Sequence, residues 1–363
     1  MSDTRTPHTP LARVLALAVA LVAVVGVIVL AFSWPSVTAE PRDLPVAIAG
    51  PEEAVAQIEA GLGEAQPDAI AFTEVADRDE AVEAIEAREV YGAIILGQQP
   101  EVLTSSAASA AVAQLLSGAA GQLQQAANAQ AAAAAQAQGL DTVPTIEVTV
   151  TDVVPLADTD PRGTGLASAM FPLVLGGMLG GIAISFAVIG AMRRILAVTV
   201  YSAGGGLVLA GILGGWFGSL PGDYWLNAGA IALTLLAISA FITGMSALLG
   251  RAGLGLGALT ILLVANPISS AAVPKEFLPA PWGEVGQWFP PGAGATLLRD
   301  VNYFPNADAA FPLLVLTGWA VVGLALSLVG HFRTAGGAES DAEAAHEDDR
   351  VDESEPEPEP VQP

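Results

Sequence analysis

Residues that commonly carry out chemistry are few in this chain and lie far apart. Its three histidines, His8, His331 and His346, are neither near one another nor inside an apolar run. Cysteine is absent, and Lys275 is the only lysine. A histidine-based metal site, a catalytic base or a thiolate ligand is therefore not expected. We predict that this chain is not an enzyme and has no cofactor, no metal and no catalytic residues.

The composition also limits how the protein can use ATP. No Gly-x-x-x-x-Gly-Lys-Ser/Thr segment occurs, so the chain lacks the phosphate-binding loop of a P-loop ATPase. Any ATP must be hydrolysed by another polypeptide. The chain has 37 acidic and 13 basic residues, which disfavours nucleic acid as a partner because phosphates bind basic surfaces.

The most unusual segment, residues 273–308, is rich in proline and tryptophan. Prolines break helices, and tryptophan prefers the membrane–water interface. We interpret the segment either as a plain loop on the membrane surface or as a partly re-entrant lid over a translocation route. In the lid interpretation, Arg299 binds an anionic group or pairs with Asp300 or Glu284; in the other, it only anchors a helix end. The candidate lid residues are Pro274, Pro279, Pro281, Trp282, Pro290, Pro291 and Arg299.

The elements that must position this segment are apolar runs. The chain is 53% hydrophobic and only 14% charged, with a mean hydropathy of +0.56. Runs of about 20 apolar residues can cross a hydrocarbon layer of roughly 30 Å as helices. The fold class is therefore a polytopic α-helical membrane protein with six transmembrane helices. The predicted spans are 14–34, 166–189, 195–217, 225–249, 254–272 and 309–329, the last five forming a membrane domain over residues 166–333.

The basic residues predict the orientation of these helices. Arg193, Arg194 and Arg251 lie in connections that share one side of the membrane. By the positive-inside rule that side is cytoplasmic, which places residues 1–13 and both termini inside and residues 35–165 outside. The first run is predicted to be an uncleaved anchor; a cleaved signal peptide is the alternative. The preference for arginine and alanine suggests a bacterial source, hence a multi-pass protein of the bacterial plasma membrane.

The external residues 35–165 alternate strand-like and helix-like runs, which predicts an α/β domain inserted between the first two spans. Residues 105–139 are rich in Ala and Gln and are predicted to form one long helix. The acidic tail 334–363 lacks an apolar cluster and is predicted to be disordered in the cytoplasm.

Glycines with small-xxx-small spacing occur in two of the predicted spans. Such spacing lets helix backbones approach closely, either within one subunit or across a homodimer face. The packing candidates are Gly176, Gly177, Gly180, Gly181, Gly211 and Gly215.

The layout resembles the ABC type-2 permeases, and more closely their phage-infection-protein (YhgE/Pip) branch. The resemblance rests on the single anchor, the large external insertion, and the proline-rich stretch with Pro290-Pro291 and Leu297-Leu298-Arg299 before the last helix. It implies a permease-like subunit that exports a lipid-like or amphipathic substrate with a separate ATPase. The alternative is a non-transporting surface or secretion-system assembly protein, because the inner connection at 190–194 is too short for the usual cytoplasmic loop. The bilayer, a separate ATPase and a second copy are the expected partners.

The predicted orientation can be tested in this cysteine-free chain. Single cysteines at Ser105 and Thr145 should react with an impermeant thiol reagent on intact cells, and one at Ser340 should not. Labelling at Ser340 alone would contradict the orientation.

Overall fold

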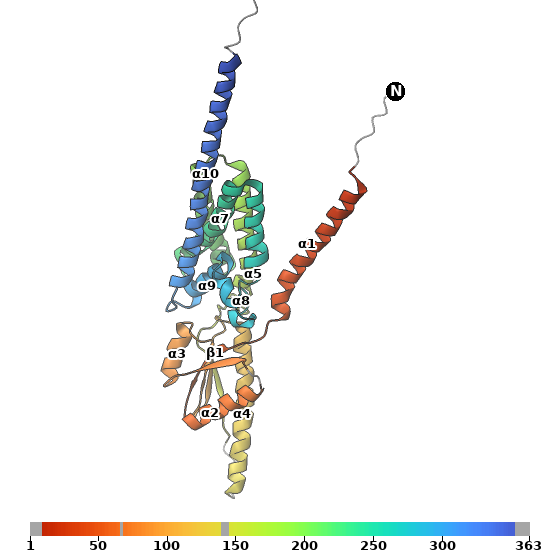
Figure 1. The fold of residues 1–363 in the computed structure, drawn as a ribbon. Coiled ribbons are helices and arrows are strands. Elements are labelled where there is room, and N and C mark those ends of the chain that lie inside the picture. Colours follow the sequence, from red (N-terminus) through yellow and green to blue (C-terminus); the bar gives the residue numbers. More distant parts are fainter. Residues whose placement is uncertain (1–8, 66–67, 139–144, 353–363) are drawn as a thin grey trace, which may run out of the picture.

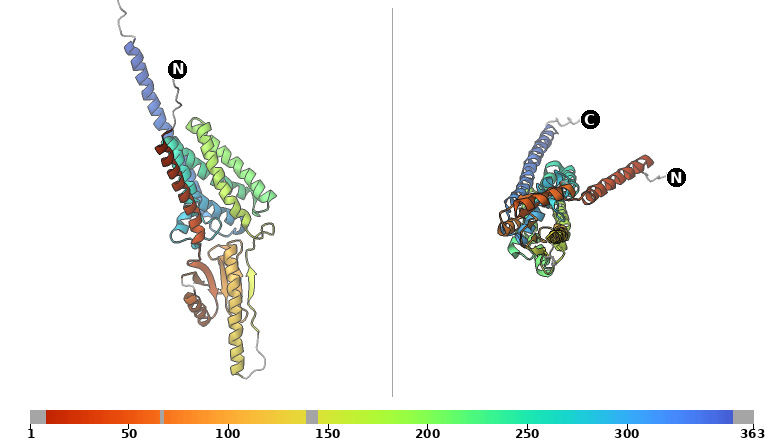
Figure 2. Two further views of the ribbon diagram at one scale, coloured as in Figure 1. Left: turned by 90° about the vertical axis from the view of Figure 1, so that its right-hand side faces the viewer. Right: turned by 90° about the horizontal axis from the view of Figure 1, so that it is seen from below.

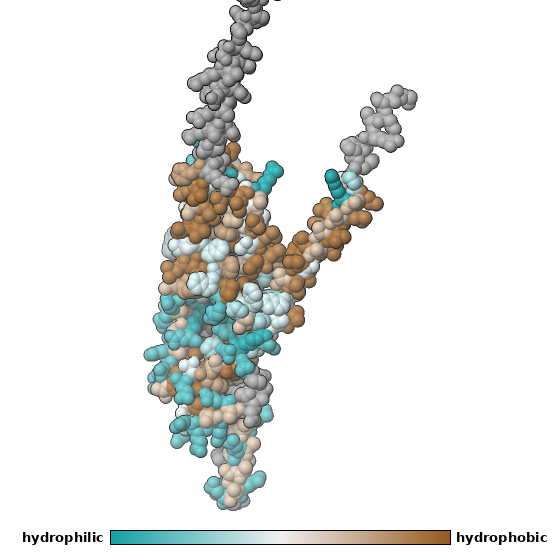
Figure 3. All heavy atoms as spheres, viewed as in Figure 1, coloured by the Kyte–Doolittle hydropathy of each residue, from teal (hydrophilic) through white to brown (hydrophobic). Residues whose placement is uncertain are grey.

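The computed structural model describes the chain trace of residues 9–65, 68–138 and 145–352, and the side chains of 9–61, 68–138 and 145–332. A bundle of long helices forms one part, and a small sheet with its covering helices forms the other (Figure 1). The apolar surface covers the bundle and α1, and the hydrophilic surface gathers over the sheet (Figure 3). This division is that of a membrane part and a water-facing part.

The sheet has five strands in the order β2-β1-β3-β4-β5, with β1 paired parallel to β2 and β3, and β4 antiparallel to β3 and parallel to β5. The strands are β1 (Leu44–Ala49), β2 (Ile70–Glu74), β3 (Gly92–Ile95), β4 (Glu101–Thr104) and β5 (Thr149–Asp152). The helices beside them are α2 (Glu52–Ala65), α3 (Arg78–Glu86) and α4 (Ala110–Ala137). Strand β4, four residues long like β3 and β5, was not predicted from the sequence.

Alternation along the strands separates two cores. Val46 and Ile48 of β1 pack with Val112 and Leu116 of α4, whereas the intervening Ala47 belongs to the cluster with α3. Successive strand side chains point to opposite faces, so the sheet buries both. Helix α4 extends beyond the sheet, away from the bundle (Figures 1 and 2).

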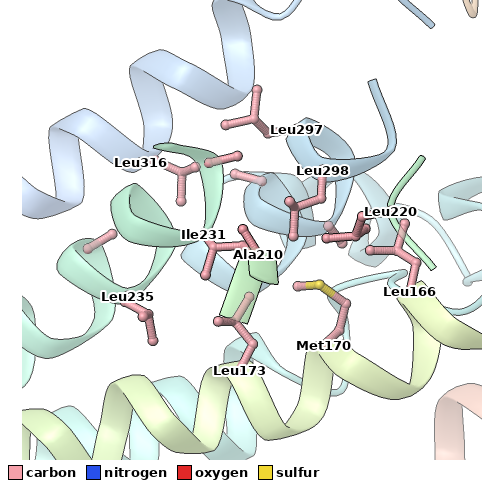
Figure 4. Close-up of a cluster of buried hydrophobic side chains, with 14 of the residues drawn as sticks. Leu166, Met170, Leu173, Ala210, Leu220, Ile231, Leu235, Leu297, Leu298 and Leu316 are labelled. Atoms are coloured by element: carbon pink, nitrogen blue, oxygen red, sulfur yellow. The ribbon is translucent and has the colours of Figure 1, made fainter. Parts of the chain in front are cut away.

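The bundle contains α5 (Thr164–Ala187), α6 (Ala191–Ala210), α7 (Tyr224–Leu259) and α10 (Ala310–Asp352), with α1 (Leu11–Val37) leaning away from it (Figure 1). Two π-helical turns, η1 (Gly211–Trp216) and η2 (Thr260–Ala265), continue α6 and α7. Figure 4 shows Leu166, Met170 and Leu173 of α5 facing Ile231 of α7 and Leu298 in one buried cluster. Short elements connect α7 to α10: η3 (Lys275–Phe277), α8 (Trp282–Gln287) and α9 (Pro290–Tyr303).

Five helices in the described part are long and apolar enough to cross a membrane, where the sequence predicted six. The predicted spans 225–249 and 254–272 both fall in the stretch Tyr224–Ala265, of 42 residues. Within it Gly250 has a non-helical backbone, with φ 63° and ψ −140°. A Cβ on Gly257 would lie 3.4 Å from the Cα of Ile242, although an unbroken helix would separate these residues by roughly 22 Å. The chain therefore folds back on itself at Gly250.

The packing glycines behave differently in the two spans. A Cβ on Gly177 would lie 3.0 Å from Ile238, and one on Gly181 would lie 2.9 Å from the carbonyl oxygen of Ser239, so α5 and α7 pack in close contact there. Gly180 packs on the ring of Tyr201, and Gly176 lies in ordinary contact with the hydroxyl of that residue. Gly211 and Gly215 have no atom within 4 Å of a Cβ position. Within the described part of the chain these two glycines therefore make no close helix contact, and the homodimer face that their spacing also allows stays a prediction.

The C-terminal tail differs in part from the predicted disorder. The structure continues α10 as a helix to Asp352, over residues for which the sequence predicted disorder. Alanine and glutamate, which are frequent there, have high helix propensity and explain a helical backbone without a core. Residues 353–363 of that tail, and residues 1–8 of the leader, lie outside the described residues.

Ser105 is not a suitable site for the labelling test described above. Its side chain is buried, with 0% exposure, whereas Thr145 is exposed. Gln130, exposed on the projecting half of α4, should replace it in that experiment.

We predict that Gly181→Leu destabilises the protein by about 1–3 kcal/mol, because the added side chain overpacks the contact between α5 and α7. Gly204→Leu is the matched control, since Gly204 lies in α6 with open space at its Cβ position. Thermal unfolding in detergent checks both variants. Equal melting temperatures for the two would contradict the close contact.

Candidate functional site

The segment that follows the second half of α7 is irregular. The helix ends at Ala265 and not at the predicted Ala272, and residues 266–274 form no regular element. Pro267 explains this end, because proline lacks a backbone N–H and disfavours a helical conformation at the residue before it. An irregular segment at the end of a membrane helix must have its polar backbone groups satisfied by protein or water.

Helices α8 and α9 satisfy those groups. Gln287 Nε2 donates a hydrogen bond to the Ser269 carbonyl at 3.3 Å, and an Arg299 guanidinium nitrogen donates to the Ala271 carbonyl at 3.1 Å. Thr296 Oγ1 donates to Gln287 Oε1 at 2.7 Å and orients that amide. The 266–274 segment is thus held by side chains from the next two helices.

Glycines let the backbones approach closely enough for these bonds. A Cβ on Gly286 would lie 1.7 Å from the carbonyl oxygen of Ile268, and one on Gly283 would lie 2.0 Å from that of Lys275. No other residue type fits at either position without moving the backbone. These glycines were not among the predicted packing residues, because they do not recur in an apolar run.

The sheet part rests on the same connecting region. Arg88, which follows α3, forms an ion pair with Asp300 of α9. The hydroxyl of Tyr91 donates to Glu276 at 2.8 Å. Burial raises the pKa of Tyr91 well above its ordinary value and the Glu276 carboxylate adds to this, so the hydroxyl stays protonated and donates. Arg42, just before β1, donates to the Phe277 carbonyl at 2.8 Å.

Between the two parts lies a cavity of about 490 Å³. Its polar lining comes from both of them: Arg88 and Tyr91 on the sheet side, and Lys275, Glu276 and Arg299 on the other. Lys275 is bonded to Glu284 at 2.7 Å. Acidic side chains outnumber basic ones in this lining, but most of them already have a cationic or hydroxyl partner.

Arg299 differs from these paired residues. It is half-buried and donates to one carbonyl, and it forms no ion pair in the part of the chain that the structure describes. Burial lowers its pKa to about 10, which still leaves the guanidinium charged at neutral pH. The partners predicted for it are taken: Asp300 pairs with Arg88, and Glu284 pairs with Lys275. The arginine is therefore a cation available to an anion from outside the chain.

The other predicted lid residues lie in different parts of the connecting region and do not form one cluster. Pro274 lines the cavity of about 490 Å³. Pro279 and Pro281 precede α8, the first residue of which, Trp282, packs edge-on against Trp34 of α1 with ring centroids 6.3 Å apart. Pro290 and Pro291 begin α9, where the missing N–H of proline costs no helical hydrogen bond. Sequence reasoning missed Arg88, Tyr91 and Glu276, because nothing in a single sequence shows which parts of the chain meet.

The arginines used to predict orientation lie at the opposite end of the bundle. Arg194 donates to the carbonyls of Val188 at 2.7 Å and Ser185 at 3.0 Å, which satisfies the last turn of α5. Arg193 is exposed beside it, and Arg251 follows the reversal at Gly250. Within the described residues, no group of three or more His, Cys, Asp or Glu side chains could hold a metal ion.

A chain with several long apolar helices and a family match over most of its length can be classified. It matches the family described as ABC-2 family transporter protein over residues 13–329. The protein therefore belongs to the ABC-2 transporter family and is a multi-pass membrane protein. No curated protein and no solved structure matches it. Membership indicates a permease subunit of an ABC exporter, a family in which the ATPase is usually a separate subunit.

We predict that Arg88→Ala destabilises the docking of the sheet part by about 3–5 kcal/mol, because it leaves the Asp300 carboxylate, 4% exposed, buried without its partner. Arg78→Ala is the control: the Arg78 side chain is 46% exposed, and its partner Glu101 keeps a hydrogen bond from Thr151, so loss of this ion pair should cost only about 0–1 kcal/mol. Thermal unfolding and limited proteolysis of the two variants measure the difference. If Arg88→Ala/Asp300→Ala is no more stable than Arg88→Ala, the pair is not coupled.

Proposed function

We propose that this chain is the membrane subunit of an exporter that moves a lipid-like or amphipathic substrate outward, driven by a separate ATPase. The observation that carries the proposal is the cavity of about 490 Å³, partly open to the surface, that lies where the sheet part rests on the ends of the bundle helices. A substrate leaving the bundle at that end would meet this cavity, which has both polar and apolar walls, before reaching water. The chain itself supplies no catalytic group in this proposal and is not an enzyme.

The proposed orientation has six membrane crossings. The reversal at Gly250 supports it, because it turns the 42-residue stretch Tyr224–Ala265 into two antiparallel segments. The described ends of α1 and α10 lie at the end of the bundle away from the sheet (Figures 1 and 2). Helix α5 runs from the sheet part toward that end, so Arg193, in the turn after α5, lies there, as does Arg251 at the reversal of α7. The positive-inside rule makes that end cytoplasmic, so the sheet part lies outside a bacterial plasma membrane.

The turn between α5 and α6 is the surface that we propose for the ATPase. Ile189 is 84% exposed and Met192 is 69% exposed, and Arg193 is exposed next to them. Exposed apolar side chains beside a basic residue, at the cytoplasmic end, suit a protein partner. In this proposal the short connection between α5 and α6 binds the ATPase directly and takes the place of the larger cytoplasmic loop expected of such permeases.

The second candidate function is that of a surface or secretion-system assembly protein of the YhgE/Pip type. Helix α4 favours it, because its 28 residues include no charged side chain and its far end projects past the sheet (Figure 1). Such a projection suits contact with another protein outside the cell. A homodimer is a further proposal, but it would not use Gly177 or Gly181, which are occupied by contacts within the chain.

Co-purification tests the proposed function. The tagged protein, extracted from its native membrane in mild detergent, should bring down an ATPase, and Ile189→Asp should reduce the recovered ATPase at least roughly tenfold, because it places a charge in an apolar contact. Val37→Asp is the matched control: Val37 is 82% exposed at the outer end of α1.

The outcomes separate the two functions. Recovery of the ATPase with wild type and Val37→Asp, but not with Ile189→Asp, supports the exporter. Recovery of extracytoplasmic proteins without an ATPase contradicts it and favours the assembly protein.

A further inference from the structure

We propose that two adjoining cavities at the outer end of α5 together bind one anionic amphiphile, with its charged headgroup in the first and its alkyl chain in the second. The first is a cavity of about 280 Å³, here called the headgroup cavity, and the second a cavity of about 560 Å³, called the chain cavity. The inference rests on the proposed function only in taking this amphiphile as the exported substrate; the binding is a property of this chain alone.

The headgroup cavity is suited to an anion. Arg299 and Arg162 line it, and neither forms an ion pair within the described residues. Its one acidic residue is Asp160, whose carboxylate oxygens already accept the backbone N–H groups of Thr164 at 3.1 Å and Gly165 at 2.7 Å. The lining thus contains two guanidinium groups and one carboxylate, and that carboxylate already accepts hydrogen bonds from the first backbone N–H groups of α5. Guanidinium groups bind phosphate and carboxylate oxygens in a bidentate geometry.

The first turn of α4 adds backbone donors to the same cavity. Ala110 and Ala111 line it, and their backbone N–H groups have no partner among the described residues. The first N–H groups of a helix are free to bind an anion, and the dipole of a long helix favours negative charge there. This end supports the arginines but does not define the site without them.

The chain cavity has the opposite character. None of its lining residues is Asp, Glu, Lys or Arg, and its walls include Phe32 and Pro35 of α1 and Met170 and Phe171 of α5. Its volume of about 560 Å³ lies within the range of roughly 300–1,000 Å³ typical of ligand pockets. An alkyl chain would be favoured there because apolar surface leaves water.

The two cavities adjoin along a common wall. Ala167 of α5 and the residues Ala272 and Val273 of the irregular segment line both. Arg299 reaches the same wall, since it donates to the carbonyl of Ala271. A molecule with a charged head and an apolar chain would therefore lie across the 266–274 segment, with each end in its matching environment.

Helix α1 gives this site access from the membrane. Residues Leu11 to Leu30 are all exposed, and α1 contacts the bundle near its outer end, where Phe32 packs edge-on against Phe171 with ring centroids 6.2 Å apart. The chain cavity lies at the point where α1 and α5 converge, and the surfaces on both sides are apolar (Figures 1 and 3). The occupant is therefore expected to be a lipid that exchanges sideways with the bilayer. Free phosphate could bind in the headgroup cavity, but it has no alkyl chain to occupy the chain cavity.

Fluorescence quenching by brominated lipids tests the proposal with the whole chain in phosphatidylcholine vesicles and no ATPase. Ser36 lines the chain cavity and is exposed, so Ser36→Cys in this cysteine-free chain can carry a bimane fluorophore. Brominated phosphatidic acid should be preferred over brominated phosphatidylcholine roughly tenfold, as expected for a charged hydrogen-bonded headgroup. Arg299→Gln and Arg162→Gln should each lower the preference, and Arg251→Gln, at the other end of the bundle, should leave it unchanged.

The other arms separate the alternatives. Equal quenching by the two lipids in the wild type overturns the proposal. So does relief of the quenching by millimolar inorganic phosphate, which would identify a site for free phosphate. If Arg299→Gln does not fold, loss of the preference in Arg162→Gln supports the site and retention overturns it. Failure to recover an ATPase would contradict the exporter function and leave this result intact.

Discussion

The structure depends on one constraint: the irregular backbone of residues 266–274 lies at the end of a membrane helix and must have its carbonyls satisfied. Gln287 and Arg299 donate to two of those carbonyls, and glycines in α8 let the backbones approach. An unsatisfied polar group costs several kcal/mol in hydrocarbon, so these contacts decide where the segment can lie. Every cavity discussed above has part of this segment as a wall.

The sheet part is also held by the connecting region between α7 and α10. Its polar contacts to Asp300 and Glu276 are formed between segments far apart in the chain; Arg88 and Asp300 are separated by 212 positions. Removing one member of such a buried pair leaves a desolvated charge, which destabilises the contact between the two parts. The arrangement forms a partly open cavity with charged side chains in its lining at one end of the bundle, and a cavity without charged side chains beside α1.

Charge is distributed to match these roles. Among the predicted spans no Asp, Glu, Lys or Arg occurs, so the helices cross the bilayer without an ionisable relay. Membership of the ABC-2 transporter family, in which a separate ATPase usually supplies the energy, agrees with this composition.

Much of this architecture is determined by local sequence. Apolar runs longer than a bilayer is thick specify membrane helices, and alternation specifies β1, β2 and β3, because both signals depend on neighbouring residues alone. Only the tertiary structure shows which residues far apart in the sequence contact each other, because local patterns do not encode such contacts. It decided that Gly177 and Gly181 pack against α7 while Gly211, with similar spacing, faces open space. It also decided that Asp300 pairs with Arg88, so that Arg299 has no ion pair among the described residues, because a pairing is set by which distant segments meet.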